Sequence, residues 1–254
     1  MQRRCSISAT WRARPSTVTS TTEPWPPARA PARALTTAAS PHKEARVSAA
    51  HPFVDLQHEI PGLLLDMKYH GDDNFMGTPV DGYEAQRAWL TEPAAQALVG
   101  VQRALARFDL GLKIFDAYRP QRAVDHFLRW CDSPCDAALK TRYYPSLEKA
   151  ELFSEGYLSK SSSHCRGSTV DLTIVSLNNG EDRPTELDMG TIFDFFGPQS
   201  WLDCDSISPQ ARANRLLLQQ LMTAAGFIPF HHEWWHFTLR DEPYPHTAFD
   251  IPIR

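Results

Sequence analysis

The spacing of apolar residues along the chain predicts helices in three segments. After Pro93, apolar residues recur at helical intervals and predict a helix over residues 94–107. A second helix is expected through residues 123–128. Leucines at helical spacing predict a third helix over residues 214–225, which we expect to end at Gly226 because glycine commonly follows the last turn of a helix.

Short apolar and β-branched runs predict strands between these helices. The sequence GLKIFDAYRP suits a buried strand that runs into a loop at Tyr118, Arg119 and Pro120. Residues 169–175 (TVDLTIV) predict a core strand, and residues 233–240 (EWWHFTLR) predict the last strong one. Strands and helices are interspersed without a regular β-α-β repeat. The pattern therefore favours a single α+β domain with a central, mainly antiparallel sheet flanked by helices.

Composition limits the class of protein. The 254 residues are 42% hydrophobic and 11% aromatic, which is ample for a packed core. No run of 18 apolar residues occurs, so we expect a soluble protein without a membrane span. The formal net charge of −4 provides no basic surface for nucleic acid, and we expect no such partner.

Residues 1–48 differ in composition from the rest of the chain. They are rich in Ala, Ser, Thr, Pro and Arg, with eight basic residues against two acidic ones. Such a segment buries too little apolar surface to offset its ordering entropy, so we expect a disordered or non-native extension before a domain at 49–254. A transit-like peptide and an unrecognised export signal stay open. The segment lacks the apolar stretch of a secretory signal, which favours the cytoplasm over the periplasm.

The five cysteines are an odd number in a chain of ordinary size and do not indicate a disulfide framework. Cys131 and Cys135 are the one closely spaced pair in the sequence. Because no second pair accompanies them, they are a weak metal signal. We interpret them as free thiols, with a local disulfide as the alternative.

A first candidate site lies in the segment 162–171 (SSHCRGSTVD). On an unbroken strand, His164 and Asp171 would face opposite sides of the sheet because they are seven residues apart. Gly167 supplies a turn between them, so both side chains can meet at one metal ion, and their nitrogen and oxygen donors suit zinc. Two alternatives stay open. Asp171 accepts backbone hydrogen bonds while His164 is a polar loop residue, or Cys165 is a thiolate ligand.

A second candidate site lies in the segment 230–237 (FHHEWWHF). A catalytic zinc site needs a third protein ligand and a base beside the bound water, and His236 and Glu233 can supply both. Residues i and i+3 do not share a face of a flat strand, so we expect Glu233 on the turn that leads into the strand of His236. His231 and His232 compete for the ligand role. The alternative is an aromatic core strand with a paired glutamate.

Arg119 is the third candidate, at the end of a buried strand and in a loop stiffened by Pro120. Amide hydrolysis passes through a tetrahedral intermediate with a developing oxyanion. A guanidinium group can hold that oxyanion with directed hydrogen bonds. The alternative is a surface ion pair, the usual role of an arginine after a strand.

Together, the SxHxxGxxxD segment, the later ExxH in an aromatic strand and the upstream YRP arginine resemble the zinc D-alanyl-D-alanine dipeptidase family of the vancomycin-resistance type. The resemblance covers nearly all of residues 55–254. It includes DMKY at 66–69, GTPVDGY at 77–83, DMG at 188–190 and RDEPYP at 240–245.

The resemblance implies a catalytic role for five positions. His164, Asp171 and His236 match the family's zinc ligands, with one zinc ion per subunit. Glu233 matches its general base and acid, and Arg119 its transition-state stabiliser. The implied reaction is an attack by metal-activated water on the peptide bond, without a covalent enzyme intermediate.

Three further positions match substrate-binding groups of the family. Tyr69 and Asp194 align with groups that hold the substrate's ammonium end, and Ser162 lies beside its carboxylate end. The resemblance therefore implies hydrolysis of the free dipeptide D-alanyl-D-alanine to two D-alanines. It is also compatible with a small homo-oligomer.

Three other functions stay open. The first is a zinc carboxypeptidase or endopeptidase of the same fold that acts on cell-wall peptide. The second is a non-catalytic zinc module like the hedgehog signalling domain, against which Glu233 and Arg119 argue because a structural metal site needs neither. The third is a metal-free binding protein.

Overall fold

The computed structural model describes residues 51–178, 180 and 183–254, so the predicted extension at 1–48 lies outside the described residues. The described helices, with short 3-10 helices labelled η, are α1 (Leu56–Glu59), η1 (Lys68–His70), α2 (Glu92–Ala106), α3 (Gln121–Cys131), α4 (Ala137–Tyr143), α5 (Glu151–Ser154), η2 (Ser163–Arg166), η3 (Pro198–Ser200) and α6 (Pro209–Ala224). The described strands are β1 (Phe53–Asp55), β2 (Leu64–Leu65), β3 (Trp89–Thr91), β4 (Leu110–Asp116), β5 (Thr169–Ser176), β6 (Thr185–Glu186), β7 (Phe227–Phe230) and β8 (Glu233–Leu239).

The main sheet has the strand order β2-β4-β5-β8-β7, and β6 pairs with β5. β2 runs parallel to β4, while the other neighbouring strands are antiparallel. A second, two-stranded sheet pairs β1 with β3. The expected α+β class with a mainly antiparallel sheet is therefore confirmed. β5 lies between β4 and β8, and its sequence is apolar and β-branched because all but its last residue is buried.

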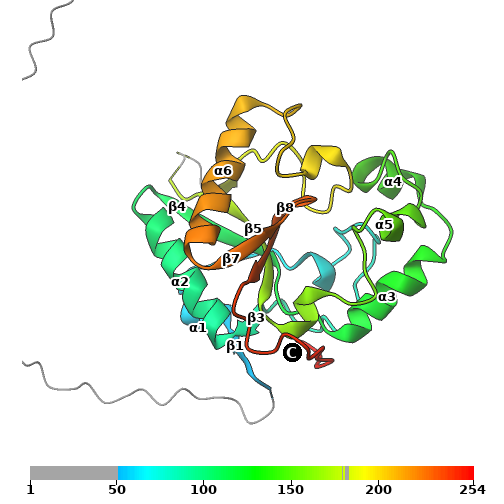
Figure 1. Cartoon of the computed structure of the whole chain (residues 1–254), viewed down its shortest axis with the longest axis horizontal. Coiled ribbons are helices and arrows are strands. Elements are labelled where there is room, and N and C mark those ends of the chain that lie inside the picture. The colour runs from blue at the N-terminus through cyan, green and yellow to red at the C-terminus, as the bar shows by residue number, and fades with distance from the viewer. Residues whose placement is uncertain (1–50, 179, 181–182) are drawn as a thin grey trace, which may run out of the picture. The chain divides into compact units, whose positions relative to one another are not determined.

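Helices lie on both sides of the main sheet (Figure 1). In this view α2 and α6 lie on the left, where α2 contacts β4 and α6 contacts β7. α2 buries Leu98, Val101 and Leu105, which recur at helical spacing and face the core. The helices α3, α4 and α5 lie on the right of the sheet. The candidate residues of β5 and β8 are thus carried by the rigid centre of the fold.

The three predicted helices are confirmed, with different ends. α6 begins at Pro209 instead of residue 214, because its first turn is set by a cap and not by leucines. The Oγ of Ser208 accepts a hydrogen bond from the backbone N–H of Ala211 at 3.0 Å, and Pro209 occupies the first helical position, where its missing N–H costs nothing.

No helix in the described part of the chain is both long and apolar enough to cross a membrane. Cys131 and Cys135 are free thiols in this structure, as are Cys165 and Cys204, in agreement with the free-thiol interpretation of the close pair.

A tight turn between η2 and β5 directs the candidate side chains of the first segment toward one place. Gly167 ends η2 with a φ of 78°, in the left-handed region that favours glycine. A Cβ at this position would lie 2.2 Å from the ring of Phe53, so the approach of the chain also requires glycine. The turn lets His164 on η2 and Asp171 on β5 point to the same place, as the sequence predicts.

A bulge in β8 directs the candidate side chains of the second segment toward the same cavity. β7 pairs regularly with β8 as far as Pro229 and Phe237, but the next residue, Phe230, pairs with Glu233. The extra residues turn β8 so that Glu233 and His236 reach one cavity, although an unbroken strand would point them to opposite faces. Glu233 is itself the first residue of β8 and does not belong to the turn at 231–232, which corrects the expected position.

Candidate active site and metal centre

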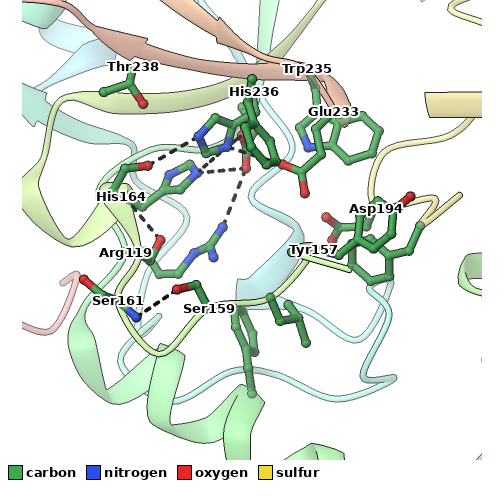
Figure 2. Close-up of a pocket in the computed structure, with 18 of the residues that line it drawn as sticks. Arg119, Tyr157, Ser159, Ser161, His164, Asp194, Glu233, Trp235, His236 and Thr238 are labelled. Atoms are coloured by element: carbon green, nitrogen blue, oxygen red, sulfur yellow. Dashed lines mark hydrogen bonds and ion pairs between the residues drawn. The ribbon is translucent and has the colours of Figure 1, made fainter. Parts of the chain in front are cut away.

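One cavity of about 420 Å³ contains every candidate residue. The eight predicted site residues all line it, and they are Tyr69, Arg119, Ser162, His164, Asp171, Asp194, Glu233 and His236. They come from η1, the start of η2 and its preceding residue, β5, β8 and the loops after β4 and β6, so the site exists only in the folded chain. Figure 2 shows His164, His236 and Glu233 grouped at the top of this cavity, with Arg119 below them and Asp194 on the right.

The three predicted metal ligands form a compact cluster. His164 Nε2 lies 3.2 Å from Asp171 Oδ2, and His236 Nδ1 lies 3.1 Å from Asp171 Oδ1. The two ring nitrogens are 3.3 Å apart. Within the described residues, this is the one group of three or more His, Cys, Asp or Glu side chains whose donor atoms are close enough to share an ion.

The second nitrogen of each histidine is already engaged. His164 Nδ1 donates to the backbone carbonyl of Ala117 at 2.7 Å, which leaves Nε2 with a lone pair directed at the cluster. His236 Nε2 lies 3.3 Å from the Oγ of Ser163, which leaves Nδ1 on the cluster side. Partners of this kind fix the ring orientation and tautomer of metal-binding histidines. Sequence reasoning missed Ser163, because a serine next to another serine gives no separate signal.

The cluster fits a metal ion better than it fits a hydrogen-bonded network. Two nitrogens held tetrahedrally at zinc bond lengths of about 2.0–2.1 Å lie about 3.3 Å apart, which matches the separation of His164 Nε2 and His236 Nδ1, and each nitrogen lies close to one oxygen of Asp171. Asp171 is almost fully buried, and its Oδ1 has no hydrogen-bond partner of good geometry among the described residues. A buried carboxylate oxygen without a proton donor is expensive unless a cation faces it.

The competing ligands lie elsewhere. His231 is exposed and lies 3.5 Å from Asp203, and the ring of His232 stacks on Trp201. The thiol of Cys165 is buried and does not belong to the donor cluster. The structure thus separates His236 from its histidine neighbours, a distinction that the FHHEWWHF pattern alone leaves open.

Two buried carboxyl groups beside the cluster have opposite electrostatic environments. Burial raises the pKa of Asp171, but the close approach of His164 and His236 outweighs burial and lowers this pKa overall. Burial, followed by the charges of Asp171 and Asp194, raises the pKa of Glu233 well above its ordinary value. Glu233 Oε2 lies 3.5 Å from His236 Nδ1, next to the cluster. Glu233 is therefore placed to exchange a proton close to a bound ion.

Arg119 is buried at the floor of the cavity. Its Nε donates to Asp116 Oδ2 at 2.9 Å, and its Nη2 lies 3.6 Å from Asp171 Oδ2. The guanidinium carbon lies 5.1 Å from the ring centre of Tyr69 and 5.2 Å from that of Phe127. These contacts exclude the surface ion pair that was the alternative for Arg119. They hold its positive charge beside the proposed metal ligands.

Asp116 is a further site residue that sequence reasoning missed. Its Oδ1 accepts a hydrogen bond from the hydroxyl of Tyr83 at 2.7 Å, while its Oδ2 accepts from Arg119. The side chain is fully buried. The sequence signal was a charged residue at the end of an apolar strand, which is also an ordinary place for a strand to end.

Tyr69 and Asp194 form a pair at another part of the cavity wall. The hydroxyl of Tyr69 donates to Asp194 Oδ2 at 2.9 Å. Asp194 adopts a φ of 59°, an uncommon conformation for a residue other than glycine, which often marks a functional position. Burial, followed by the charge of Asp171, raises the pKa of Asp194 well above its ordinary value. Because its neighbours do not offset the cost of burying its negative charge, the carboxyl group of Asp194 is suited to pair with a cation that enters the cavity.

Ser162 caps η2 at the edge of the cluster. Its Oγ accepts a hydrogen bond from the backbone N–H of His164 at 3.3 Å, which holds the turn that carries the histidine. Ser162 also lines the cavity, and its hydroxyl retains a hydrogen for a bound acceptor.

Comparisons with known proteins show which proteins this chain is similar to. A family model described as D-ala-D-ala dipeptidase, Peptidase_M15, matches residues 49–254. A D-alanyl-D-alanine dipeptidase of Enterococcus faecalis is 43% identical over 201 residues, covering 79% of this chain and 98% of that protein. A protein of the same name from Streptomyces coelicolor is 43% identical with the same coverage. One from Escherichia coli is 33% identical over 73% of this chain and 83% of its own.

Proposed function

The chain belongs to the D-Ala-D-Ala dipeptidase family of peptidases, and on that premise we propose that it hydrolyses the free dipeptide D-alanyl-D-alanine to two D-alanines. The observation that carries the proposal is the convergence of His164, Asp171 and His236 in one cavity with Glu233 and Arg119. A purely structural metal site requires neither of the last two.

The proposed cofactor is one zinc ion per subunit, held by His164, Asp171 and His236. Two imidazole nitrogens and one carboxylate oxygen are the ligand types of catalytic zinc sites, which keep a further position for water or substrate. Zinc in such a site supplies a Lewis acid for the scissile carbonyl and makes water nucleophilic near neutral pH.

We assign Glu233 the role of general base and then general acid. Its carboxylate lies next to the donor cluster but belongs to no ligand pair, so it is free to accept a proton from the attacking water. The same carboxyl group then returns the proton to the departing amino group. The aromatic residues around β8, including Trp235, limit water in this part of the cavity.

Arg119 is the proposed stabiliser of the negative charge that develops on the carbonyl oxygen. Because its guanidinium is held by Asp116 and by two aromatic rings, it is oriented before the substrate arrives. A preoriented donor avoids the reorganisation that water would need, and this is the main source of electrostatic catalysis.

Asp194 and Tyr69 are the proposed acceptors of the substrate's ammonium group, and Ser162 the proposed donor to its carboxylate. Buried acceptors for the ammonium group favour a substrate with a free amino end, because a blocked amine would leave Asp194 without a cation. A longer peptide with no amine at that distance would lose the same contact. The proposal therefore favours the dipeptide over a cell-wall pentapeptide.

A hydrolysis assay tests the proposal directly. The purified protein, with its metal content measured, is incubated with D-Ala-D-Ala, its L,L isomer, N-acetyl-D-Ala-D-Ala and a pentapeptide ending in D-Ala-D-Ala. We expect rapid release of D-alanine from the free dipeptide alone. Faster cleavage of the pentapeptide would favour the carboxypeptidase alternative, and absence of bound metal with no hydrolysis would refute the proposal.

A further inference from the structure

The proposed substrate carries two opposite charges, and the cavity wall holds groups suited to both. Among the described residues that line the cavity, two side chains have a permanent positive charge, Arg119 and Arg166. Arg119 is held by Asp116 and by its two aromatic neighbours, and the proposed mechanism assigns its remaining donors to the carbonyl oxygen of the substrate. Arg166 is the cation that the proposed mechanism leaves unused.

One donor of the Arg166 side chain is engaged by an acidic residue, and its terminal N–H groups remain available. It is the last residue of η2, and its Nε donates to Glu242 Oε2 at 2.8 Å. The Arg166 side chain is 23% exposed and that of Glu242 is 11% exposed, so the pair is partly shielded from water. Within the described residues, the terminal Nη groups of Arg166 have no hydrogen-bond partner. A guanidinium that gives Nε to one carboxylate keeps an edge of two N–H groups for a second one.

The strand that follows Arg166 begins at the end of the cavity opposite Asp194. The chain leaves η2 through Gly167 and enters β5 at Thr169, whose Oγ1 lies 2.9 Å from the Oγ1 of Thr238. Thr238 lines the cavity on the left of the two histidines in Figure 2, whereas Asp194 lies on the right. A dipeptide across the cluster with its ammonium at Asp194 would extend its carboxylate toward the η2 end.

We propose that Arg166 binds the C-terminal carboxylate of the substrate and so determines that this end must be free, with Glu242 positioning the guanidinium. The inference rests on the proposed function, because it assumes a zwitterionic peptide in the cavity. It adds a charged partner to the neutral hydroxyl of Ser162 at the carboxylate end. A charged donor distinguishes a carboxylate from an amide far better than a hydroxyl does.

The test compares D-Ala-D-Ala with D-alanyl-D-alaninamide, which lacks only the negative charge. For the wild-type enzyme we expect kcat/KM to favour the acid over the amide by about 10- to 100-fold, the range for one charge-assisted contact. In Arg166→Gln this ratio should fall to within about threefold of unity. The loss should arise mainly from a higher KM for the acid, while cleavage of the amide changes little. Arg166→Lys should keep part of the preference, since the charge remains but the paired N–H edge is lost.

Glu242→Gln is the matched control, because it removes the same ion pair from the other side and leaves the cation. If Arg166 only ties η2 to the C-terminal segment, Glu242→Gln should reproduce the effect of Arg166→Gln on both substrates. We expect instead that Glu242→Gln keeps the preference for the acid. Equal losses for acid and amide in Arg166→Gln, or a wild-type enzyme without preference, would overturn the inference. Metal content and thermal unfolding of each variant identify any variant that fails to fold, in which case Arg166→Lys decides.

A binding measurement separates this inference from the proposed function. Calorimetry on Glu233→Gln, which should not turn over substrate, gives the affinities of the acid and the amide with and without Arg166→Gln. An Arg166-dependent preference in binding, together with a wild-type protein that hydrolyses neither ligand, would retain the inference and refute the proposed reaction. Hydrolysis of the acid with no Arg166-dependent preference in binding would retain the proposed reaction and refute the inference about Arg166.

Discussion

Individual side chains in this cavity differ more in their surroundings than in their chemistry. Asp171 and Glu233 are both buried carboxyl groups, but Asp171 lies between two imidazoles and Glu233 lies at the edge of the cluster. The neighbouring histidines lower the pKa of Asp171, whereas burial raises that of Glu233. Two acids in different environments can serve different functions, one as a permanent anion and one as a proton carrier.

Replacing Glu233 by Gln should separate metal binding from turnover. The amide keeps the size of the side chain but cannot accept the proton, so kcat should fall by about 10²- to 10⁴-fold, the usual contribution of a general base. Zinc content should stay at the wild-type level because Glu233 is not one of the clustered donors. The measurement is metal analysis beside steady-state kinetics on the same preparation. A variant with near-normal kcat, or one that has lost its metal, would contradict the assigned role.

The raised pKa of Asp194 leads us to expect that substrate affinity depends on pH. Its pKa is raised by burial, so in the free enzyme the carboxyl group takes up a proton at a higher pH than an ordinary aspartic acid does. The protonated group cannot pair with an ammonium. As the pH falls through this raised pKa, KM for the free dipeptide should therefore rise, because binding must then release the proton.

The control for this prediction is Asp194→Asn. The amide carries no proton to release, so KM should be high at every pH and its acid-side slope should disappear. The preference for D-Ala-D-Ala over its N-acetyl form should shrink at the same time. A wild-type KM that stays flat toward acid pH, or an Asn variant with the same slope, would show that another group controls binding.

Sequence alone could predict the candidate site residues better than the residues that hold them in place. The eight candidates were indicated by residue types and order that match a family pattern, and all of them line one cavity. Asp116 and Ser163 escaped prediction, because their contacts depend on where β4, η2 and β8 meet in space. Arg166 was visible in the motif, but its orientation depends on Glu242, more than 70 residues away along the chain.

At the scale of single elements, two local irregularities make the site. The turn at Gly167 aligns His164 with Asp171, and the bulge in β8 aligns Glu233 with His236. The first was predictable because glycine marks such turns. The second was not, since the run EWWHFTLR has the composition of a regular strand, and only the pairing with β7 reveals the extra residues.

Gly167→Ala should destabilise the protein measurably. The left-handed φ and the approach of Phe53 to 2.2 Å from an added Cβ both oppose the substitution. We expect a loss of about 2–4 kcal/mol in the free energy of unfolding, from backbone strain and overpacking together. Zinc affinity should fall as well, because the turn sets the distance between His164 and Asp171. Denaturant unfolding with metal titration measures both effects.

Gly100→Ala is the matched control for this substitution. Gly100 lies within α2, is exposed, and has no heavy atom within 4 Å of an added Cβ. Alanine there should stabilise the protein by about 0.5–1 kcal/mol, because glycine in a helix interior costs that amount. Similar destabilisation by both substitutions would mean that the turn at Gly167 has no special requirement.

At the scale of the whole molecule, the strand order explains why distant segments meet at the candidate metal centre. β5 and β8 are neighbours although about 60 residues separate them, and Asp171 and His236 are direct cross-strand partners. η2 adds His164 from the turn before β5. The interior of β5 was predictable from its apolar run, but its position between β4 and β8 was not, because long-range strand pairing leaves no local trace in the sequence.

Because the ion would join η2, β5 and β8, its removal should weaken the fold as a whole. Without a cation, Asp171 keeps a buried oxygen with no hydrogen-bond partner among the described residues. A ligand present at about 100 times its dissociation constant stabilises the native state by about 2.7 kcal/mol, which corresponds to about 5–10 °C in Tm for a domain of this size. We therefore expect a strong chelator to lower Tm by at least this amount, and zinc to restore it.

In His236→Ala the chelator should have a much smaller effect, because one of the three ligands is missing. An unfolding curve that is the same with and without chelator would mean that the cluster holds no structural ion.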